Sequence, residues 1–312
     1  MPNSQVKYLI IIAGPTAVGK TELAIRLAKT LKTEIISADS RQIFRELSIG
    51  TAKPSEEELK EVPHHFINSH SISEQYSAGD FERDALKLLD TLFQDHDFVV
   101  MTGGSGLYIK AVSEGLDALP APKEGLRELL TDRLLKEGLE KLQEEIKNLD
   151  PDFAATKEIF NPQRVVRALE VFHTTGIPIS QYQQKNLNKR PFKQILIALD
   201  RDRTELYHRI DSRMDQMLNQ GLVEEAKSVI EFRDSHALQT VGYKEVYGCL
   251  DGLYNAKEME RLLKQNSRRY AKRQLTWFRH QGDFKWFKPE EFDKILDYVN
   301  SESGLNKNSW LF

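Results

Sequence analysis

Residues 14–21 read Gly-Pro-Thr-Ala-Val-Gly-Lys-Thr, a complete phosphate-binding loop of the form G-x-x-x-x-G-K-[ST]. The apolar run at 8–13 directly precedes it and is short and β-branched, as in a strand buried on both faces. After the loop, leucines and alanines recur at helical spacing from Leu23 to Leu31. Strand, loop and helix stand in the order that the motif requires, so the chain is constrained to an α/β fold.

The composition of the loop predicts how it binds phosphate. Its glycines allow backbone N–H groups to turn inward, and the following helix adds partial positive charge at its N-terminus. The Lys20 side chain is expected to reach the terminal phosphates, and the Thr21 hydroxyl is expected to bind Mg²⁺. All eight loop residues are candidate phosphate ligands: Gly14, Pro15, Thr16, Ala17, Val18, Gly19, Lys20 and Thr21.

Strands and helices alternate through the first third of the chain. A second strand at 34–38 runs into Asp39, and a third at 98–101 ends at the glycine-rich turn 103–106. An apolar stripe from Phe81 to Leu92 predicts a helix between these two strands. This rhythm predicts a P-loop parallel-sheet core with helices on both faces, and ligands bind at the carboxyl ends of such strands. The phosphate loop, Asp39 and the 103–106 turn are therefore expected to converge.

The rhythm breaks between residues 116 and 194, which contain no convincing strand. Two helices of mixed charge follow a proline-rich boundary, and a third begins at Asn161-Pro162 and stops near Gly176. A strand at 195–199 resumes the sheet, and helices are predicted at 203–219, 222–232 and 256–280. We predict a core formed by 1–115 and 195–312, with 116–194 as an all-helical insertion domain.

Composition narrows the class of protein. The net charge is −3, with 40% hydrophobic and 29% charged residues, which is ordinary for a soluble globular protein. The single cysteine, Cys249, excludes an internal disulfide and fits a reducing compartment. Met1–Gln5 show no signal-peptide pattern, and no run approaches the ~18 apolar residues of a membrane helix. We expect a cytoplasmic protein with no membrane partner.

A basic segment near the C-terminus suggests a polyanionic partner. Seven lysines and arginines and no acid lie between Arg261 and Arg279, and the stretch 272–279 interleaves cations with Trp277 and Phe278. Cations can neutralise phosphates while aromatic rings stack on unpaired bases. The alternative is a solvated helix face whose aromatic side chains pack into the core. The nearby Gly242-Tyr243-Lys244 gives a weaker signal of the same kind.

Two further sets of charged residues are candidates for chemistry. Asp39 at the end of the second strand could act as a base or metal partner, or it could cap a turn. Arg209 and Arg213 share one face of a predicted helix that also carries Arg203. These arginines could clamp a polyphosphate, or they could pair with the acids of the same segment: Asp202, Glu205, Asp211 and Asp215.

Taken together, these motifs resemble those of bacterial tRNA dimethylallyltransferases along nearly the whole chain. The matching stretches are Gly14–Thr21, Asp39–Gln42, 49–54, 63–65, 103–108, Gln163–Arg167 with its continuation to Val171, 241–244 and 272–279. Their order and spacing make the resemblance specific, which the phosphate loop alone would not be.

The resemblance implies transfer of a dimethylallyl group from dimethylallyl diphosphate to N6 of the adenosine 3′ to the anticodon. The loop would then hold a diphosphate leaving group, Asp39 would accept a proton, and Lys20, Thr21, Mg²⁺ and Arg213 would stabilise the diphosphate. Contacts to the tRNA anticodon stem-loop are expected, from this resemblance and the basic segment, at Asp39, Ser40, Arg41, Gln42, Ser105, Arg127, Gln163, Arg164, Val165, Val166, Arg167, Gly242, Tyr243, Lys244, Lys272, Arg273 and Trp277.

Two departures and two rival interpretations remain. Ser105 stands where family members often carry threonine, and one cysteine cannot supply the zinc finger of the eukaryotic relatives. A small-molecule or nucleoside kinase would share the loop, Mg²⁺ and an acid after the second strand. A non-catalytic RNA-binding regulator would leave Asp39 and the arginines without a task. We expect a monomer.

Overall fold

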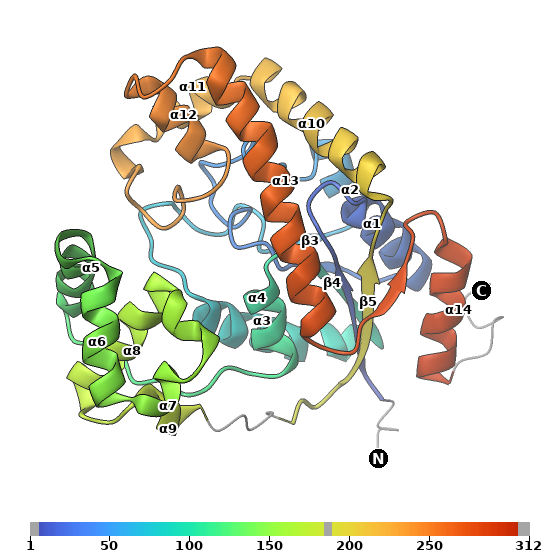
Figure 1. Cartoon of the computed structure of the whole chain (residues 1–312). Coiled ribbons are helices and arrows are strands. Elements are labelled where there is room, and N and C mark those ends of the chain that lie inside the picture. Colours follow the sequence, from blue (N-terminus) through green and yellow to red (C-terminus); the bar gives the residue numbers. More distant parts are fainter. Residues whose placement is uncertain (1–5, 184–188, 305–312) are drawn as a thin grey trace. The chain divides into compact units, whose positions relative to one another are not determined.

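A computed structural model describes residues 6–183 and 189–304 of the chain. Met1–Gln5, on which the signal-peptide prediction depends, lie outside these residues. The chain divides into two compact units, one built from residues up to 114 and from 189 onward, and one from residues 115–188. We call them the core unit and the helical unit. Figure 1 traces the whole chain.

The core unit contains a parallel sheet, which confirms the predicted fold class. Within the described residues the sheet has six strands in the order β3-β2-β4-β1-β5-β6. They are β1 (Tyr8–Ala13), β2 (Ile35–Ser37), β3 (His64–His65), β4 (Phe98–Gly103), β5 (Lys193–Leu199) and β6 (Lys285–Phe287). In the central register Ala13 lies beside both Gly103 and Ala198, so the segments that follow β1, β4 and β5 all leave from one edge.

The sheet corrects the predicted end of the insertion. Lys193 pairs with Tyr8, so the strand begins inside the stretch 116–194 that was assigned to the insertion. The sequence does not reveal this start, because the first two residues of the strand, Lys193 and Gln194, are polar and precede its apolar run. The short strands β3 and β6 were not predicted, since two or three residues carry no measurable alternation.

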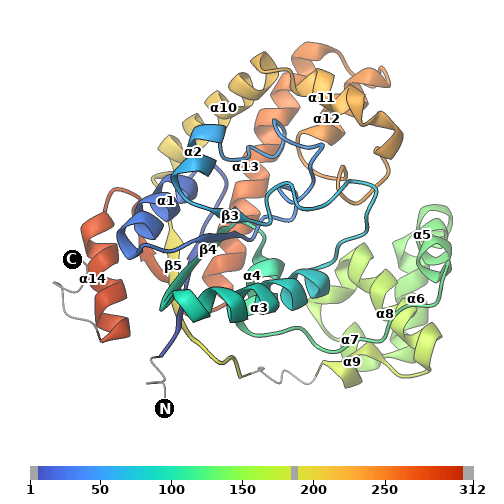
Figure 2. The same cartoon turned by 180° about the vertical axis from the view of Figure 1, so that it is seen from behind.

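Alternate side chains of β1 enter two apolar layers, because successive side chains of a strand point to opposite faces. Ile10 and Ile12 pack with α1 (Lys20–Leu31), α10 (Arg203–Asn219) and α14 (Phe292–Ser303). Leu9 and Ile11 pack with α3 (Ala78–Asp95) and α4 (Gly106–Ser113), which Figure 2 shows from behind. Helices therefore cover both faces, as the strand–helix rhythm predicts.

A third apolar cluster lies beyond the sheet. It joins the segment 43–72 to the C-terminal half of α10, α11 (Leu222–Ser228), α12 (Tyr243–Leu250) and the start of α13 (Ala256–His280). The 3₁₀ turn η2 (Ile230–Phe232) packs Phe232 against this cluster, whereas the short helix α2 (Glu56–Glu61) contacts α1. The predicted helices at 203–219 and 256–280 agree with α10 and α13, whereas the one at 222–232 is broken after Ser228.

The helical unit is all α within its described residues. Its elements are α5 (Leu126–Glu137), α6 (Leu139–Leu149), α7 (Pro151–Ala154), the 3₁₀ turn η1 (Lys157–Phe160), α8 (Pro162–Thr175) and α9 (Ile179–Tyr182). Asn161 caps α8 by accepting hydrogen bonds from the N–H groups of Gln163 and Arg164, and Gly176 ends it in a left-handed conformation. Leucines and valines of α5, α6 and α8 form its core.

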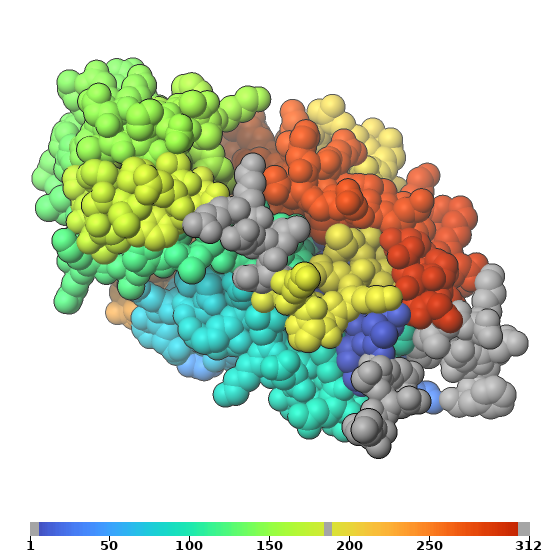
Figure 3. Space-filling view, turned by 90° about the horizontal axis from the view of Figure 1, so that it is seen from below, coloured from blue at the N-terminus to red at the C-terminus, as the bar shows by residue number. Residues whose placement is uncertain are grey.

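The face at which the strands begin lies far from the phosphate loop. Figure 3 looks onto this face, with the start of β1 in blue and the start of β5 in yellow. Lys7 is tied there to Asp97 by an ion pair of 2.9 Å, which joins the segment before β1 to the one before β4. Among the described residues, no helix combines the length and the apolar character needed to cross a bilayer.

Candidate active site

The phosphate loop lines a cavity of about 540 Å³ in the core unit. The loop makes its turn with Gly19 at φ +112°, a left-handed conformation that glycine adopts without strain, and α1 begins at the next residue. Asp39, Lys53, Arg213 and Tyr270 line the same cavity. The sequence predicted Arg213 as a phosphate ligand and Asp39 as a base or metal partner, whereas it gave no role to Lys53 or Tyr270.

Lys20 is held against its own loop. Its Nζ donates hydrogen bonds to the carbonyl oxygens of Gly14 at 3.0 Å and Pro15 at 2.7 Å. Burial lowers the pKa of Lys20 to about 7; the Asp39 carboxylate opposes this shift, and the Arg213 guanidinium adds to it. A negatively charged ligand would reverse the shift, because it would stabilise the ammonium form.

Two of the three candidate arginines of α10 reach the phosphate loop. Arg209 Nε donates to the carbonyl oxygen of Ala17 at 2.8 Å, and Arg213 Nη1 lies 3.5 Å from Thr16 Oγ1. Burial lowers the pKa of Arg213, with Asp39 opposing the shift. Arg203 instead lies over the ring of Tyr207 at 5.1 Å.

The acids that could have paired with these arginines are engaged elsewhere. Asp202 accepts hydrogen bonds from the first turn of α10, and Glu205 pairs with Arg201. Asp211 pairs with Arg268 and Asp215 with Lys264. Surface pairing, the alternative explanation of the arginines, therefore does not apply to Arg209 and Arg213.

Asp39 caps a turn, as one of its two interpretations predicted, and its carboxylate also faces the cavity. One oxygen, Oδ1, caps the following turn by accepting hydrogen bonds from the N–H groups of Arg41 at 2.9 Å and Gln42 at 3.4 Å. The carboxylate also lines the cavity and acts electrostatically on Lys20, Arg41 and Arg213. The turn fixes the carboxylate among these cations, so its second oxygen can accept a proton or a further hydrogen bond.

The glycine-rich turn closes the same side of the cavity. A Cβ on Gly103 would lie 2.1 Å from the carbonyl oxygen of Ala38, so only glycine allows β4 to approach the end of β2 this closely. Ser105 Oγ accepts a hydrogen bond from the N–H of Ser40 at 2.9 Å and lies 3.2 Å from the Ser40 hydroxyl. The predicted convergence of the phosphate loop, Asp39 and this turn is observed.

Gln274 of α13 joins two of these elements and was not predicted as a site residue. Its Oε1 accepts from the N–H of Thr16 at 2.9 Å, and its Nε2 donates to the carbonyl oxygen of Gly104 at 3.0 Å. The side chain is almost fully buried. Its signal in the sequence is an amide side chain at helical spacing from the apolar residues Ala271 and Phe278, on the stripe of a basic helix that packs inward.

A half-buried glutamate supports the part of the cavity wall that follows residue 48, and it was also missed. Glu225 accepts hydrogen bonds from three consecutive N–H groups, those of Ser48, Ile49 and Gly50, at 2.7–2.8 Å. The Tyr243 hydroxyl donates to the same carboxylate at 2.7 Å. This nest holds the 48–54 loop, which lines the cavity as far as Lys53, in place.

Tyr243 therefore differs from its prediction as a tRNA contact. Its side chain has no exposed surface, because it fills the third apolar cluster and lies against Gly50. Gly242 makes the preceding turn and is also buried, whereas Lys244 is exposed and lines a second cavity. Neighbouring residues of this motif thus differ in burial, and three residues of sequence do not show which of them face the core.

Helix α13 has a partly neutralised basic face. Four of its seven predicted cations pair with acids: Arg261 with Glu258, Lys264 with Asp215 and Glu260, Arg268 with Asp211, and Arg279 with Asp200. Arg269, Lys272 and Arg273 are exposed and have no acidic partner among the described residues. The solvated-face interpretation holds for the paired cations, and these three are the ones whose charge a polyanion could neutralise.

Trp277 lies at the end of this exposed stretch. Its indole packs on the backbone of Gly106, where an added Cβ would meet the ring at 2.4 Å, and it meets Phe278 edge to face. Trp277 thus helps to pack α13 against the glycine-rich turn and is only partly exposed. Core packing accounts for most of its surface.

The helical unit carries the remaining predicted tRNA contacts. Val165 and Val166 are fully buried in its core, so their side chains cannot contact RNA, and their inclusion was wrong. They fell within a run of five consecutive residues, of which a helix must turn some inward. Gln163 and Arg164 are exposed, with Arg164 paired to Glu158, and Arg127 and Arg167 flank the buried Glu170.

The cavity fits a magnesium ion bound together with a phosphate ligand. Among the described residues no group of three or more His, Cys, Asp or Glu side chains could hold a metal. Thr21 lines the cavity at the start of α1, and Mg²⁺ is commonly held by one or two protein oxygens together with phosphate oxygens and water. Thr21 is the residue that would hold it here.

Comparisons with known proteins converge on one family. Residues 42–281 match the model of a family described as IPP transferase. The chain is 53% identical to a tRNA dimethylallyltransferase of Cytophaga hutchinsonii over 95% of its length and 97% of the relative's. It is 44% identical to tRNA dimethylallyltransferase 1 of Bacteroides fragilis, with 95% and 98% covered.

Solved structures agree. The full-length tRNA isopentenylpyrophosphate transferase of Bacillus halodurans is 37% identical, with a TM-score of 0.71 and 96% and 97% of the two chains covered. A eukaryotic dimethylallyltransferase, whose structure was determined while acting on tRNA, is 25% identical, with a TM-score of 0.77 and 96% and 80% covered.

Proposed function

The chain belongs to the IPP transferase family, which includes the bacterial tRNA dimethylallyltransferases, and from this premise we propose that it prenylates tRNA at the cavity described above. The donor is dimethylallyl diphosphate, and the acceptor is N6 of the adenosine on the 3′ side of the anticodon. The observation that carries the proposal is the grouping of Lys20, Arg213 and Asp39 in one cavity beside the phosphate loop.

The transfer exchanges one bond for another. The N6–C1 bond forms while the C1–O bond to the diphosphate breaks, and the electron pair of that bond leaves with the diphosphate. Lys20 and Arg213 meet the negative charge that develops on the leaving group, in a site where little water competes. Asp39 accepts the proton that N6 loses, which requires the carboxylate to lie within hydrogen-bond reach of the amine.

Thr21 would hold Mg²⁺ next to the diphosphate. The ion supplies charge neutralisation of the leaving group. Gln274 and Ser105 do not touch the reacting atoms in this scheme. Gln274 holds the N–H of Thr16, and Ser105 holds Ser40 next to Asp39, so both keep the two sides of the cavity in register.

RNA binding would use exposed cations. Arg269, Lys272 and Arg273 can neutralise phosphates of the anticodon stem-loop, and Arg127 and Arg167 offer a second set in the helical unit. Removing a base from its stack costs a few kcal/mol, and less in a single-stranded loop than in a duplex. One anticodon loop is a small target, so we expect a monomer acting on one tRNA in the cytoplasm.

Nothing in the comparisons favours the kinase interpretation. The test is to incubate the protein with Mg²⁺, unmodified tRNA and dimethylallyl diphosphate, digest the RNA, and measure the added mass on adenosine. We expect one dimethylallyl group on the adenosine 3′ to the anticodon. ATP-dependent phosphorylation of a small acceptor, with no transfer to tRNA, would overturn the proposal.

A further inference from the structure

Glu170 is a fully buried carboxylic acid in the core of the helical unit. It lies on α8, between Leu169 and Val171, which are also buried. Carboxylates are rarely buried this completely unless they are paired, because removal from water is costly. The burial of the Glu170 carboxylate therefore calls for a physical explanation.

Both of its partners are arginines that are expected to contact tRNA. Arg167 Nη1 donates to Glu170 Oε2 at 2.6 Å, and Arg127 Nη1 lies 3.7 Å from the same oxygen. Arg127 comes from α5 and keeps 52% of its side chain exposed, while Arg167 keeps 27%. One buried oxygen thus holds two guanidinium groups from different helices at the surface, and two positive charges face one negative charge.

We infer that Glu170 is a positioning residue for RNA binding: its buried carboxylate orients Arg127 and Arg167 as a fixed pair that grips a phosphodiester of the tRNA. The inference rests on the proposed function. Arginine pairs bind phosphate best when their planar forks are held in advance, since less side-chain freedom is then lost on binding.

Stability alone gives a poor account of this arrangement. The second oxygen of Glu170, Oε1, is buried and has no hydrogen-bond partner among the described residues. An unsatisfied buried acceptor destabilises a fold, and apolar side chains often replace buried ion pairs without loss. Orientation of the arginines offers a role that an apolar residue could not fill.

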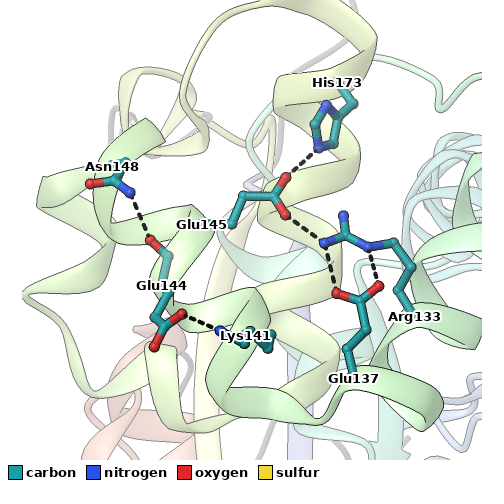
Figure 4. A network of polar contacts seen from close by, with 7 residues as sticks. All are labelled: Arg133, Glu137, Lys141, Glu144, Glu145, Asn148 and His173. Carbon is teal, nitrogen blue, oxygen red and sulfur yellow. Dashed lines mark hydrogen bonds and ion pairs between the residues drawn. The ribbon is translucent and has the colours of Figure 1, made fainter.

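A second ion-pair network in the same unit provides the contrast (Figure 4). Arg133 pairs with Glu137 at 2.8 Å and with Glu145 at 2.9 Å, and Glu145 also lies 2.8 Å from His173. Here two acids share one arginine, so its positive charge is fully compensated. Glu145 is therefore the matched control: it is an arginine-paired glutamate of the helical unit with no expected role in RNA binding.

The test is a double-mutant cycle on the full-length protein. The variants are Glu170→Gln, Arg127→Gln with Arg167→Gln, the three combined, and Glu145→Gln as control. Affinity for unmodified tRNA is measured by filter binding at several salt concentrations. Affinity for dimethylallyl diphosphate without RNA, and the thermal midpoint, report on the core unit and on folding.

We expect Glu170→Gln to weaken tRNA binding about tenfold while diphosphate affinity and the Glu145→Gln variant stay at the wild-type level. In the background without the two arginines, Glu170→Gln should change tRNA affinity less than about twofold. Wild-type affinity of Glu170→Gln, or an equal loss in both backgrounds, would overturn the inference and leave prenylation intact. Wild-type protein that neither binds nor modifies tRNA would overturn both proposals.

If Glu170→Gln does not fold, Arg127→Lys replaces it, because the Arg127 side chain is exposed. Lysine keeps the charge but lacks the planar fork that one carboxylate can align. The inference predicts a severalfold loss of tRNA affinity for this variant at constant thermal midpoint. Unchanged affinity would mean that any positive charge suffices there, and the inference would fall.

Discussion

The cavity of the core unit and the arginine pair of the helical unit hold their cations in opposite ways. In the cavity, Lys20 and Arg209 bind carbonyl oxygens of the phosphate loop, and the acids of α10 are occupied elsewhere. In the helical unit, Arg127 and Arg167 meet a buried carboxylate. Backbone oxygens carry only partial charge, so a phosphate ligand can replace them readily, whereas a carboxylate keeps its arginines in place.

This difference matches two tasks. A leaving group gains charge during the reaction, so the cations that stabilise it must be free to respond to it. A phosphodiester of bound RNA keeps its charge throughout, so the cations that grip it gain from being fixed in advance. Mutations in the cavity should therefore lower the transfer rate without weakening tRNA binding, and mutations of the RNA-binding cations should do the reverse.

Replacement of Asp39 by Asn should have the largest effect. A positioned general base typically contributes 10²- to 10⁴-fold, so the transfer rate should fall about a thousandfold. Binding of tRNA should change little, because the amide can still accept the hydrogen bonds from Arg41 and Gln42. Single-turnover transfer and filter binding measure the two quantities. A parallel loss of rate and tRNA affinity would break the proposed separation.

Replacement of Lys20 by Met should lower the transfer rate by about two orders of magnitude, as expected for one lost electrostatic contact to a leaving group. It should also raise the thermal midpoint. The folded protein disfavours the charged form of Lys20, whose pKa is about 7 instead of 10.5, so the fold is penalised at low pH.

That penalty is full below pH 7 and shrinks as the pH rises towards 10.5, where the unfolded chain also loses its proton. The stability gain of Lys20→Met should therefore be greatest near pH 6. Thermal melts at pH 6 and 9 check it, and a variant that is less stable than wild type at pH 6 would contradict the burial of the ammonium group.

The affinity for dimethylallyl diphosphate should also depend on pH through the ionisation of Lys20. Above pH 7 Lys20 is neutral in the free protein and must take up a proton on binding, so affinity for dimethylallyl diphosphate should fall up to tenfold per pH unit. Titration calorimetry from pH 6 to 9 measures it. The Lys20→Arg variant stays charged over this pH range, so it is the control: any pH dependence that it shows comes from ionisation of the ligand. Identical slopes for the two proteins would refute the assignment.

The smallest effect is expected at the exposed face of α13. Replacing Lys272 and Arg273 with Gln removes two cations that lack acidic partners, which should reduce tRNA affinity several-fold and lower the salt slope by about 2. The transfer rate at saturating tRNA should stay unchanged. Replacing Lys264, which pairs with two acids, should leave the slope at the wild-type value. A salt slope equal to wild type in the double variant would show that RNA does not meet this face.

The sequence predicted what local patterns encode. The phosphate loop, the buried strand before it and the acid after the second strand are all local, and the parallel sheet then fixes their convergence. The roles of Gln274 and Glu225 could not be predicted, because each acts by contacts with segments more than 150 residues away along the chain. Val166 and Tyr243 were misassigned because a motif names consecutive residues, while a helix turns some of them into the core.

Gln274 has one more implication, for the length of α13. The residue that holds the N–H of Thr16 directly follows Arg273 on one continuous helix of 25 residues. Each residue of an α-helix advances the side chain by about 100° around the axis, so the angle between the exposed cations and the side that faces the phosphate loop is set by the number of residues between them. Inserting one residue between Arg273 and Gln274 would turn either the cations or the amide away from its target. Helix α13 should therefore tolerate substitutions at its surface but not an insertion or deletion that changes its length.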